Sequence, residues 1–151
     1  MFGTFFPQPL DNTYRGSKVA LWLFGLVVAV RIIQSVLIIF NGYSVAKGAD
    51  GIPLDTFPPA AAQTVVALFA LSALYRLILS LLCVPVLVRY RRAIPFMFAV
   101  LVLNYLAAQL ILRFIPLAST GTPPGPVVNL ITLALAIIGL ALSLRSRSIR
   151  A

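Results

Sequence analysis

The sequence contains no histidine and no glutamate, and its carboxylates are limited to three aspartates, Asp11, Asp50 and Asp55. None of the three belongs to a long apolar run. Inside a membrane, the chain therefore has no ordinary general base, no histidine, cysteine and carboxylate set for a metal ion, and no carboxylate relay for protons. We expect a non-enzymatic protein with no metal and no cofactor.

Charge is scarce as well. Charged residues make up 10% of the 151 residues, hydrophobic residues make up 61%, and the mean hydropathy is +1.04. Soluble domains have roughly 25% charged and 45–50% apolar residues. The composition predicts an all-α integral membrane protein with a single membrane domain, 1–151. The one cysteine, Cys83, lies in an apolar run and is expected to be a packing residue.

Four apolar runs are each about long enough to cross a hydrocarbon core of ~30 Å at ~1.5 Å per residue. They predict transmembrane helices at about 18–40, 60–88, 93–115 and 127–144. The first run follows Arg15 and Lys18, as the apolar part of a signal peptide would. Its length and its interruption by Arg31 favour a retained helix over a cleaved one.

The segments between and beyond these runs have distinct compositions. Glycines and prolines predict loops at 41–59 and 116–126. The N-terminal arm, 1–17, combines phenylalanines with prolines and is expected to lie at the lipid headgroups or to dock a partner. The C-terminal tail, 145–151, is basic.

The net charge of +9 is distributed unevenly between the two sides of the predicted membrane domain. One side has the cations that we expect to contact lipid headgroups, namely Lys18, Arg89, Arg91, Arg92, Arg145 and Arg147. The other side has Lys47 with Asp50 and Asp55. The positive-inside rule then predicts an up-down-up-down bundle, N-in/C-in, in the bacterial inner (cytoplasmic) membrane. The cations are explained as topology signals, so nucleic-acid binding is not expected.

Two arginines, Arg31 and Arg76, lie within the first and second apolar runs. Counting ~1.5 Å per residue from the cytoplasmic end of each run puts both at ~18 to 20 Å, and puts Asn104 and Thr132 at ~18 Å. A second polar layer follows at ~23 to 26 Å by the same count. Its members are Gln34, Ser72, Gln109 and Asn129. The counts predict one polar level to which all four helices contribute.

The last apolar run has small and polar residues at every third or fourth position. These residues are Asn129, Thr132, Ala136, Gly139 and Ser143. Such a stripe lets membrane helices approach each other closely. We expect it to form a packing seam that faces the bundle.

An arginine at mid-bilayer costs ~2.5 to 3.5 kcal/mol on insertion scales and normally has a partner. Three hypotheses remain open for Arg31 and Arg76. Neutral groups within the bundle satisfy them, an anionic ligand binds between them, or an acid on another subunit pairs with them. The candidate partners or site residues are Arg31, Arg76, Gln34, Asn104, Gln109 and Thr132.

Two functions follow from these observations. The first is an accessory or scaffold subunit of a larger membrane complex, or a self-associating bundle, because the parts outside the membrane are too short to form a site. The alternative is a binding or transport protein for an anionic amphiphile, such as a lipid, a quinone-like ligand or a carboxylate, at the level of Arg31 and Arg76. The expected partners are membrane lipids, other membrane subunits and further copies of the chain.

Overall fold

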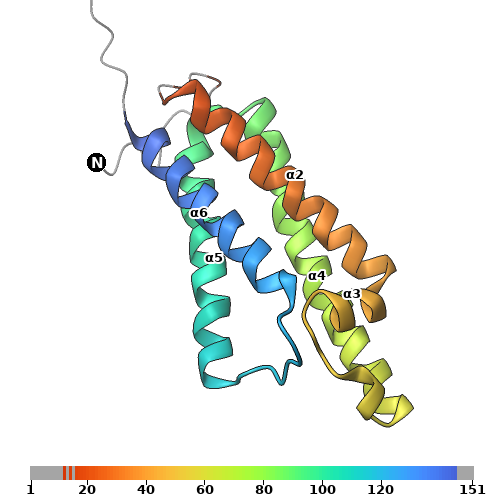
Figure 1. Ribbon diagram of the computed structural model, residues 1–151. Helices are drawn as coiled ribbons and strands as arrows, with labels where there is room; N and C mark the ends of the chain where they lie inside the picture. Colours follow the sequence, from red (N-terminus) through yellow and green to blue (C-terminus); the bar gives the residue numbers. More distant parts are fainter. Residues whose placement is uncertain (1–11, 13, 15, 146–151) are drawn as a thin grey trace, which may run out of the picture.

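The computed structural model describes residues 12, 14 and 16–145, and this part of the chain is helical without strands (Figure 1). Four of its helices are long and apolar enough to cross a membrane. They are α2 (Lys18–Phe40), α4 (Pro59–Val88), α5 (Ile94–Phe114) and α6 (Pro124–Leu144). The chain therefore has the helical fold of a membrane protein, as its composition predicts.

The starts of the long helices follow from local chemistry. Pro59 and Pro124 lie in the first turns of α4 and α6, where the missing N–H would have no partner in any case. Ser17 caps α2, because its hydroxyl oxygen accepts a hydrogen bond of 3.3 Å from the backbone nitrogen of Ala20. The fourth helix begins at Pro124 and not at 127 as predicted. Pro124 and Pro126, which were assigned to the preceding loop from the sequence, lie in the first turn of this helix.

The predicted loop at 41–59 contains regular structure that the sequence analysis missed. α3 (Gly42–Gly48) follows α2 almost directly, and η1 (Leu54–Thr56) is a single 3-10 turn. Gly42 allows α3 to approach α4, since an added Cβ would lie 3.0 Å from Cγ1 of Val66. Ala46 and Leu54 are buried there with Ile52 and Ala62. The predicted loop therefore contains a second, short helix that packs on α4.

The long helices pack in an order that differs from their order in the chain. α2 packs along both α4 and α6, and α6 packs along α5. α4 and α5 contact each other far less, although they are consecutive. They converge at η2 (Arg91–Ala93) and diverge toward the other end (Figure 1). The four helices therefore form an open arrangement in the order α4, α2, α6, α5.

The largest buried cluster joins α2, α4, α5 and α6. Phe24 and Phe98 pack edge to face, with ring centroids 5.0 Å apart and an interplanar angle of 74°. Gly139 of α6 lies directly against the Phe98 ring, where an added Cβ would overlap it. Cys83 is buried in the same cluster, as expected for a packing residue. The seam predicted on α6 thus lies in the core, with Thr132, Ala136, Gly139 and Ser143 buried and Asn129 half-buried.

The helix ends that bear the predicted headgroup cations gather at one end of the molecule (Figure 1). Lys18, Arg89 and Arg145 are exposed there. Arg91 donates from Nε to the carbonyl oxygen of Leu87 at 3.0 Å, and Arg92 is half-buried. Arg147 and most of the predicted arm and tail, 1–17 and 145–151, lie outside the described residues.

At the opposite end, the two loops that connect the long helices dock onto each other. The backbone nitrogen of Thr120 donates to the carbonyl oxygen of Gly51 at 2.8 Å, and that of Gly125 donates to Ala49 at 2.8 Å. Gly51 has a φ of +69°, and a side chain there would meet the Thr120 carbonyl oxygen. We refer to this as the loop end of the molecule.

Candidate anion-binding site

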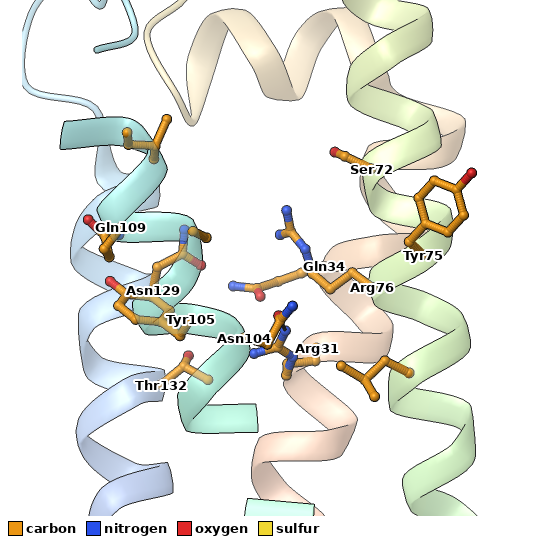
Figure 2. A pocket seen from close by; sticks show the side chains of 13 residues that line it. Arg31, Gln34, Ser72, Tyr75, Arg76, Asn104, Tyr105, Gln109, Asn129 and Thr132 are labelled. Atoms are coloured by element: carbon orange, nitrogen blue, oxygen red, sulfur yellow. Dashed lines mark hydrogen bonds between the residues drawn. The ribbon is translucent and has the colours of Figure 1, made fainter. Parts of the chain in front are cut away.

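A cavity of about 290 Å³ lies between the four long helices (Figure 2). Every residue that the sequence analysis assigned to the anion site lines it, namely Arg31, Arg76, Gln34, Asn104, Gln109 and Thr132. Ser72 and Asn129, from the second predicted polar layer, line it as well. The structure thus brings the two polar layers together around one space.

Arg31 is buried in the wall of this cavity, with 8% of its surface exposed. Its Nη2 donates to Oδ1 of Asn104 at 3.0 Å, but its Nε is buried without a partner in the described part of the chain. One turn further along α2, the hydroxyl of Ser35 is also buried and unpartnered. A neutral amide bonds to a cation without cancelling its charge, so Arg31 remains an uncompensated cation.

Arg76 reaches from α4 into the same space, beside Gln34 of α2 (Figure 2). It is half-buried, and no side chain of the described residues accepts a hydrogen bond from its guanidinium group. The main chain of Arg76 is well bonded, because its carbonyl oxygen accepts from the Ser80 hydroxyl at 2.8 Å. Two arginine side chains therefore share one cavity.

The described aspartates lie outside the cavity wall. Asp55 forms an exposed ion pair with Lys47 and accepts a hydrogen bond from the Tyr43 hydroxyl at 2.7 Å. Asp50 is half-buried near Gly125 at the start of α6. Burial raises the pKa of Asp50, and the positive charge of Arg76 opposes that rise. Asp50 therefore acts on Arg76 from the loop end without entering the site.

The hydroxyl groups in the wall are already used by their own helices. Thr132 donates to the carbonyl oxygen of Val128 at 2.8 Å, and Ser72 donates to that of Phe69 at 2.7 Å. An anion in the cavity would therefore bind to guanidinium and amide N–H groups and not to these hydroxyls. The amide nitrogen of Asn104 remains a donor, because its oxygen is the atom that faces Arg31.

The cavity is more exposed on the side formed by α4 and α5. The α5 residues Asn104, Ala108 and Gln109 line it and are exposed, and Tyr75 of α4 is 71% exposed. The back of the cavity is closed, since Arg31 of α2 and Thr132 of α6 are buried. This difference matches the weak packing between α4 and α5.

Several lining residues were missed by the sequence analysis. They are Tyr75, Leu79, Tyr105, Ala108 and Leu112. Each lies three or four positions from a polar residue of the two predicted layers, as Tyr75 does from Ser72, Tyr105 from Gln109 and Ala108 from Asn104. Helical spacing from the predicted residues was therefore the signal that would have found them.

The fold and the cavity define a helical membrane protein with a cationic site between its helices. No protein-family model matches the chain, and neither a curated protein nor a solved structure matches it.

Proposed function

We propose that this protein binds the anionic headgroup of an amphiphile in the cavity between its long helices, with Arg31 and Arg76 as the charged ligands. The observation that supports this proposal is that both guanidinium groups line one cavity to which the described residues contribute no carboxylate. A cation in a membrane is costly unless an opposite charge neutralises it. A bound anion supplies that charge.

The composition of the wall suits a headgroup. Arginine binds phosphate and carboxylate oxygens with two parallel N–H donors, and such charge-assisted bonds are about twice as strong as neutral ones. The amides of Gln34, Gln109 and Asn129 add neutral donors. A volume of about 290 Å³ is close to the lower limit of ~300 to 1,000 Å³ for ligand pockets. The cavity holds a headgroup and leaves the rest of an amphiphile outside.

We further propose an up-down-up-down bundle in the bacterial inner membrane, with both termini in the cytoplasm. The support is the distribution of charge, since the exposed Lys18, Arg89 and Arg145 share one end and Asp50 and Asp55 belong to the other. In this orientation the loop end faces outward and the site lies in the outer half of the membrane. The role is binding or transport without chemistry, because the sequence has no histidine and no glutamate.

A second candidate function is that of an accessory subunit or a self-associating bundle. It is favoured by the part of α5 beyond Asn104, where Leu106, Leu110 and Ile111 are each exposed by half or more. A partner helix that carries an acid would fill the side between α4 and α5 and neutralise Arg76. Native mass spectrometry from mild detergent separates the two candidates. A monomer that carries only lipid contradicts the subunit role, and a stable complex or homo-oligomer supports it.

Calorimetric titration of dodecyl phosphate into the full chain, in dodecyl maltoside micelles, tests anion binding. We expect saturable binding of one anion per chain. Each arginine contributes ~1.5 to 3 kcal/mol, as hydrogen bonds to charged groups do, so the variant Arg31→Gln/Arg76→Gln binds at least ~100-fold more weakly. Arg145→Gln removes an exposed cation at the end of the molecule opposite the loop end, and it serves as the control. Equal binding by all three proteins would contradict the proposal.

A further inference from the structure

We infer that the ligand is a lipid with a phosphate headgroup, and that it enters the cavity sideways from the membrane, through the opening between α4 and α5. This inference rests on the proposed function and adds the ligand class and the route to it. It is carried by three features of the site, namely the chain segments beyond its two ends, the leucines on its flank and its charge.

Other parts of the chain lie beyond the cavity in both directions along the helices. Toward the end with Lys18, Arg89 and Arg145 lies the buried cluster with Phe24, Phe98 and Leu101. Toward the loop end, α3 and the chain after it lie beyond the labelled side chains in Figure 2. The docked loops hold that segment in place through the bond from Thr120 to Gly51. A ligand that came from water on either side would have to pass one of these elements.

The remaining direction is the side between α4 and α5. These helices converge at η2 and diverge toward the loop end (Figure 1). Their residues at the edge of the cavity, Tyr75 of α4 and Ala108 of α5, are exposed to the surroundings of the molecule. In a protein that spans a membrane, those surroundings are lipid. The opening therefore connects the arginines directly with the hydrocarbon.

Apolar side chains continue from the cavity onto the outer surface of α5. Leu79 and Leu112 lie in the cavity wall itself. A shallow groove next to it shares Gln109 and Leu112 with the cavity and adds Leu106, Leu110 and Arg113. An acyl chain can lie along this surface while its headgroup is among the arginines. A water-soluble anion without an acyl chain would not contact these leucines.

The charge of the site favours a phosphate monoester over other lipid headgroups. Arg31 and Arg76 together contribute two positive charges. A phosphate monoester has about −1.5 to −2 charges near neutral pH, so it matches both guanidinium groups. A zwitterionic headgroup contains its own cation and would leave the site positive. Phosphatidic acid has the expected headgroup, and phosphatidylcholine is its matched zwitterionic comparison.

The test uses two substitutions at neighbouring alanines of α5. Ala108 lines the cavity at the opening, whereas Ala107 is exposed on the same helix and does not line it. Dioleoyl phosphatidic acid is titrated into the full chain in dodecyl maltoside micelles, and bound lipid is counted by native mass spectrometry. We expect Ala108→Trp to weaken binding at least ~10-fold by filling the opening, and Ala107→Trp to change it less than ~2-fold. Inorganic phosphate and dioleoyl phosphatidylcholine are then tested as competitors, and neither should displace the lipid.

The possible results distinguish a wrong route or a wrong ligand class from a wrong proposed function. If Ala108→Trp binds phosphatidic acid normally while Arg31→Gln/Arg76→Gln does not, the lateral route is wrong and anion binding stands. If inorganic phosphate or phosphatidylcholine competes equally, the ligand class is wrong. If no anion binds the wild-type chain, the proposed function itself is wrong. Ala108→Leu, a smaller obstruction, should weaken binding to a lesser degree and replaces Ala108→Trp if the latter does not fold.

Discussion

Arg31 of α2 and Asn104 of α5 are joined by a hydrogen bond of 3.0 Å, from the guanidinium Nη2 to the amide Oδ1. The two helices also meet through the packed rings of Phe24 and Phe98, and their main chains come close at few positions. At the level of the cavity, the bond connects its two sides. It orients the guanidinium group of Arg31 and leaves its charge uncompensated, because Asn104 is neutral. The helices therefore fix the position of the Arg31 guanidinium group, and its positive charge remains available to an anion.

A double-mutant cycle tests this bond. Asn104→Leu removes the acceptor and leaves Nη2 of Arg31 without its partner, which should lower the free energy of unfolding by ~1 to 2 kcal/mol. In an Arg31→Met background no guanidinium group remains, and the same substitution should cost less than ~0.5 kcal/mol. Unfolding of the ligand-free chain in mixed micelles measures both. Equal costs in the two backgrounds would show that the bond does not form.

The close contact between α6 and α5 predicts a strong effect at one glycine. Gly139→Ala places a methyl group against the buried Phe98 ring, which cannot move freely because it also packs on Phe24. We expect a loss of ~1 to 3 kcal/mol in the free energy of unfolding, as in other overpacked cores. Gly25→Ala in α2 is the matched control, since its new Cβ would lie an ordinary 3.6 Å from Cδ2 of Leu87. If the two variants lose the same free energy of unfolding, Gly139 does not pack against the Phe98 ring.

Asp50 predicts a pH dependence with a definite sign. Burial raises the pKa of its carboxyl group above the ordinary value of 3.8. Between that value and the higher pKa of the folded state, the folded chain binds more protons than the unfolded chain, so stability falls as the pH rises through this window. Thermal unfolding at a series of pH values above 3.8 should show this fall in the wild type and not in Asp50→Asn.

The link between Asp50 and the site is tested by removing the opposing charge. The positive charge of Arg76 lowers the pKa of Asp50, so Arg76→Met should raise that pKa further. Carbon-13 NMR of labelled aspartate measures the titration directly, and Asp55 serves as an internal reference because Lys47 and Tyr43 hold its pKa below 3.8. An Asp50 pKa that Arg76→Met leaves unchanged would mean that the two groups do not interact.

The proposed orientation predicts which residues a reagent reaches from outside the cell. Single cysteines at the exposed positions Asn12 and Ala118, in a Cys83→Ala background, report the two ends of the molecule. A membrane-impermeant maleimide should label Ala118→Cys in intact spheroplasts and should label Asn12→Cys only after permeabilisation. The opposite pattern would place the loop end in the cytoplasm.

Much of the helical fold was predictable because each span is an apolar run of sufficient length. The predicted segment 18–40 matches α2, 60–88 differs from α4 by one residue at its start, and 93–115 differs from α5 by one residue at each end. The order in which the helices pack was not predictable. Lipid chains are as apolar as leucine, so an apolar surface does not identify the helix that will cover it.

The composition of the cavity was partly predictable from depth. Counting along each helix put Arg31, Arg76 and Asn104 at one level, and the structure places all three in one cavity. Depth along a helix does not determine which way each side chain faces around it, so Tyr105 and Ala108 were missed. The open side was missed as well, because it depends on the divergence of α4 and α5.

A distance measurement between arginine nitrogen and lipid phosphorus tests most directly whether Arg31 and Arg76 bind a lipid phosphate. Solid-state NMR can detect dipolar coupling between nitrogen-15 in labelled arginine side chains and the phosphorus-31 of phosphatidic acid, with the chain in phosphatidylcholine bilayers. We predict coupling in the wild type and in Arg145→Gln that disappears in large part in Arg31→Met/Arg76→Met. If the double variant retains the coupling of the wild type, the lipid phosphate binds elsewhere and Arg31 and Arg76 are not its site.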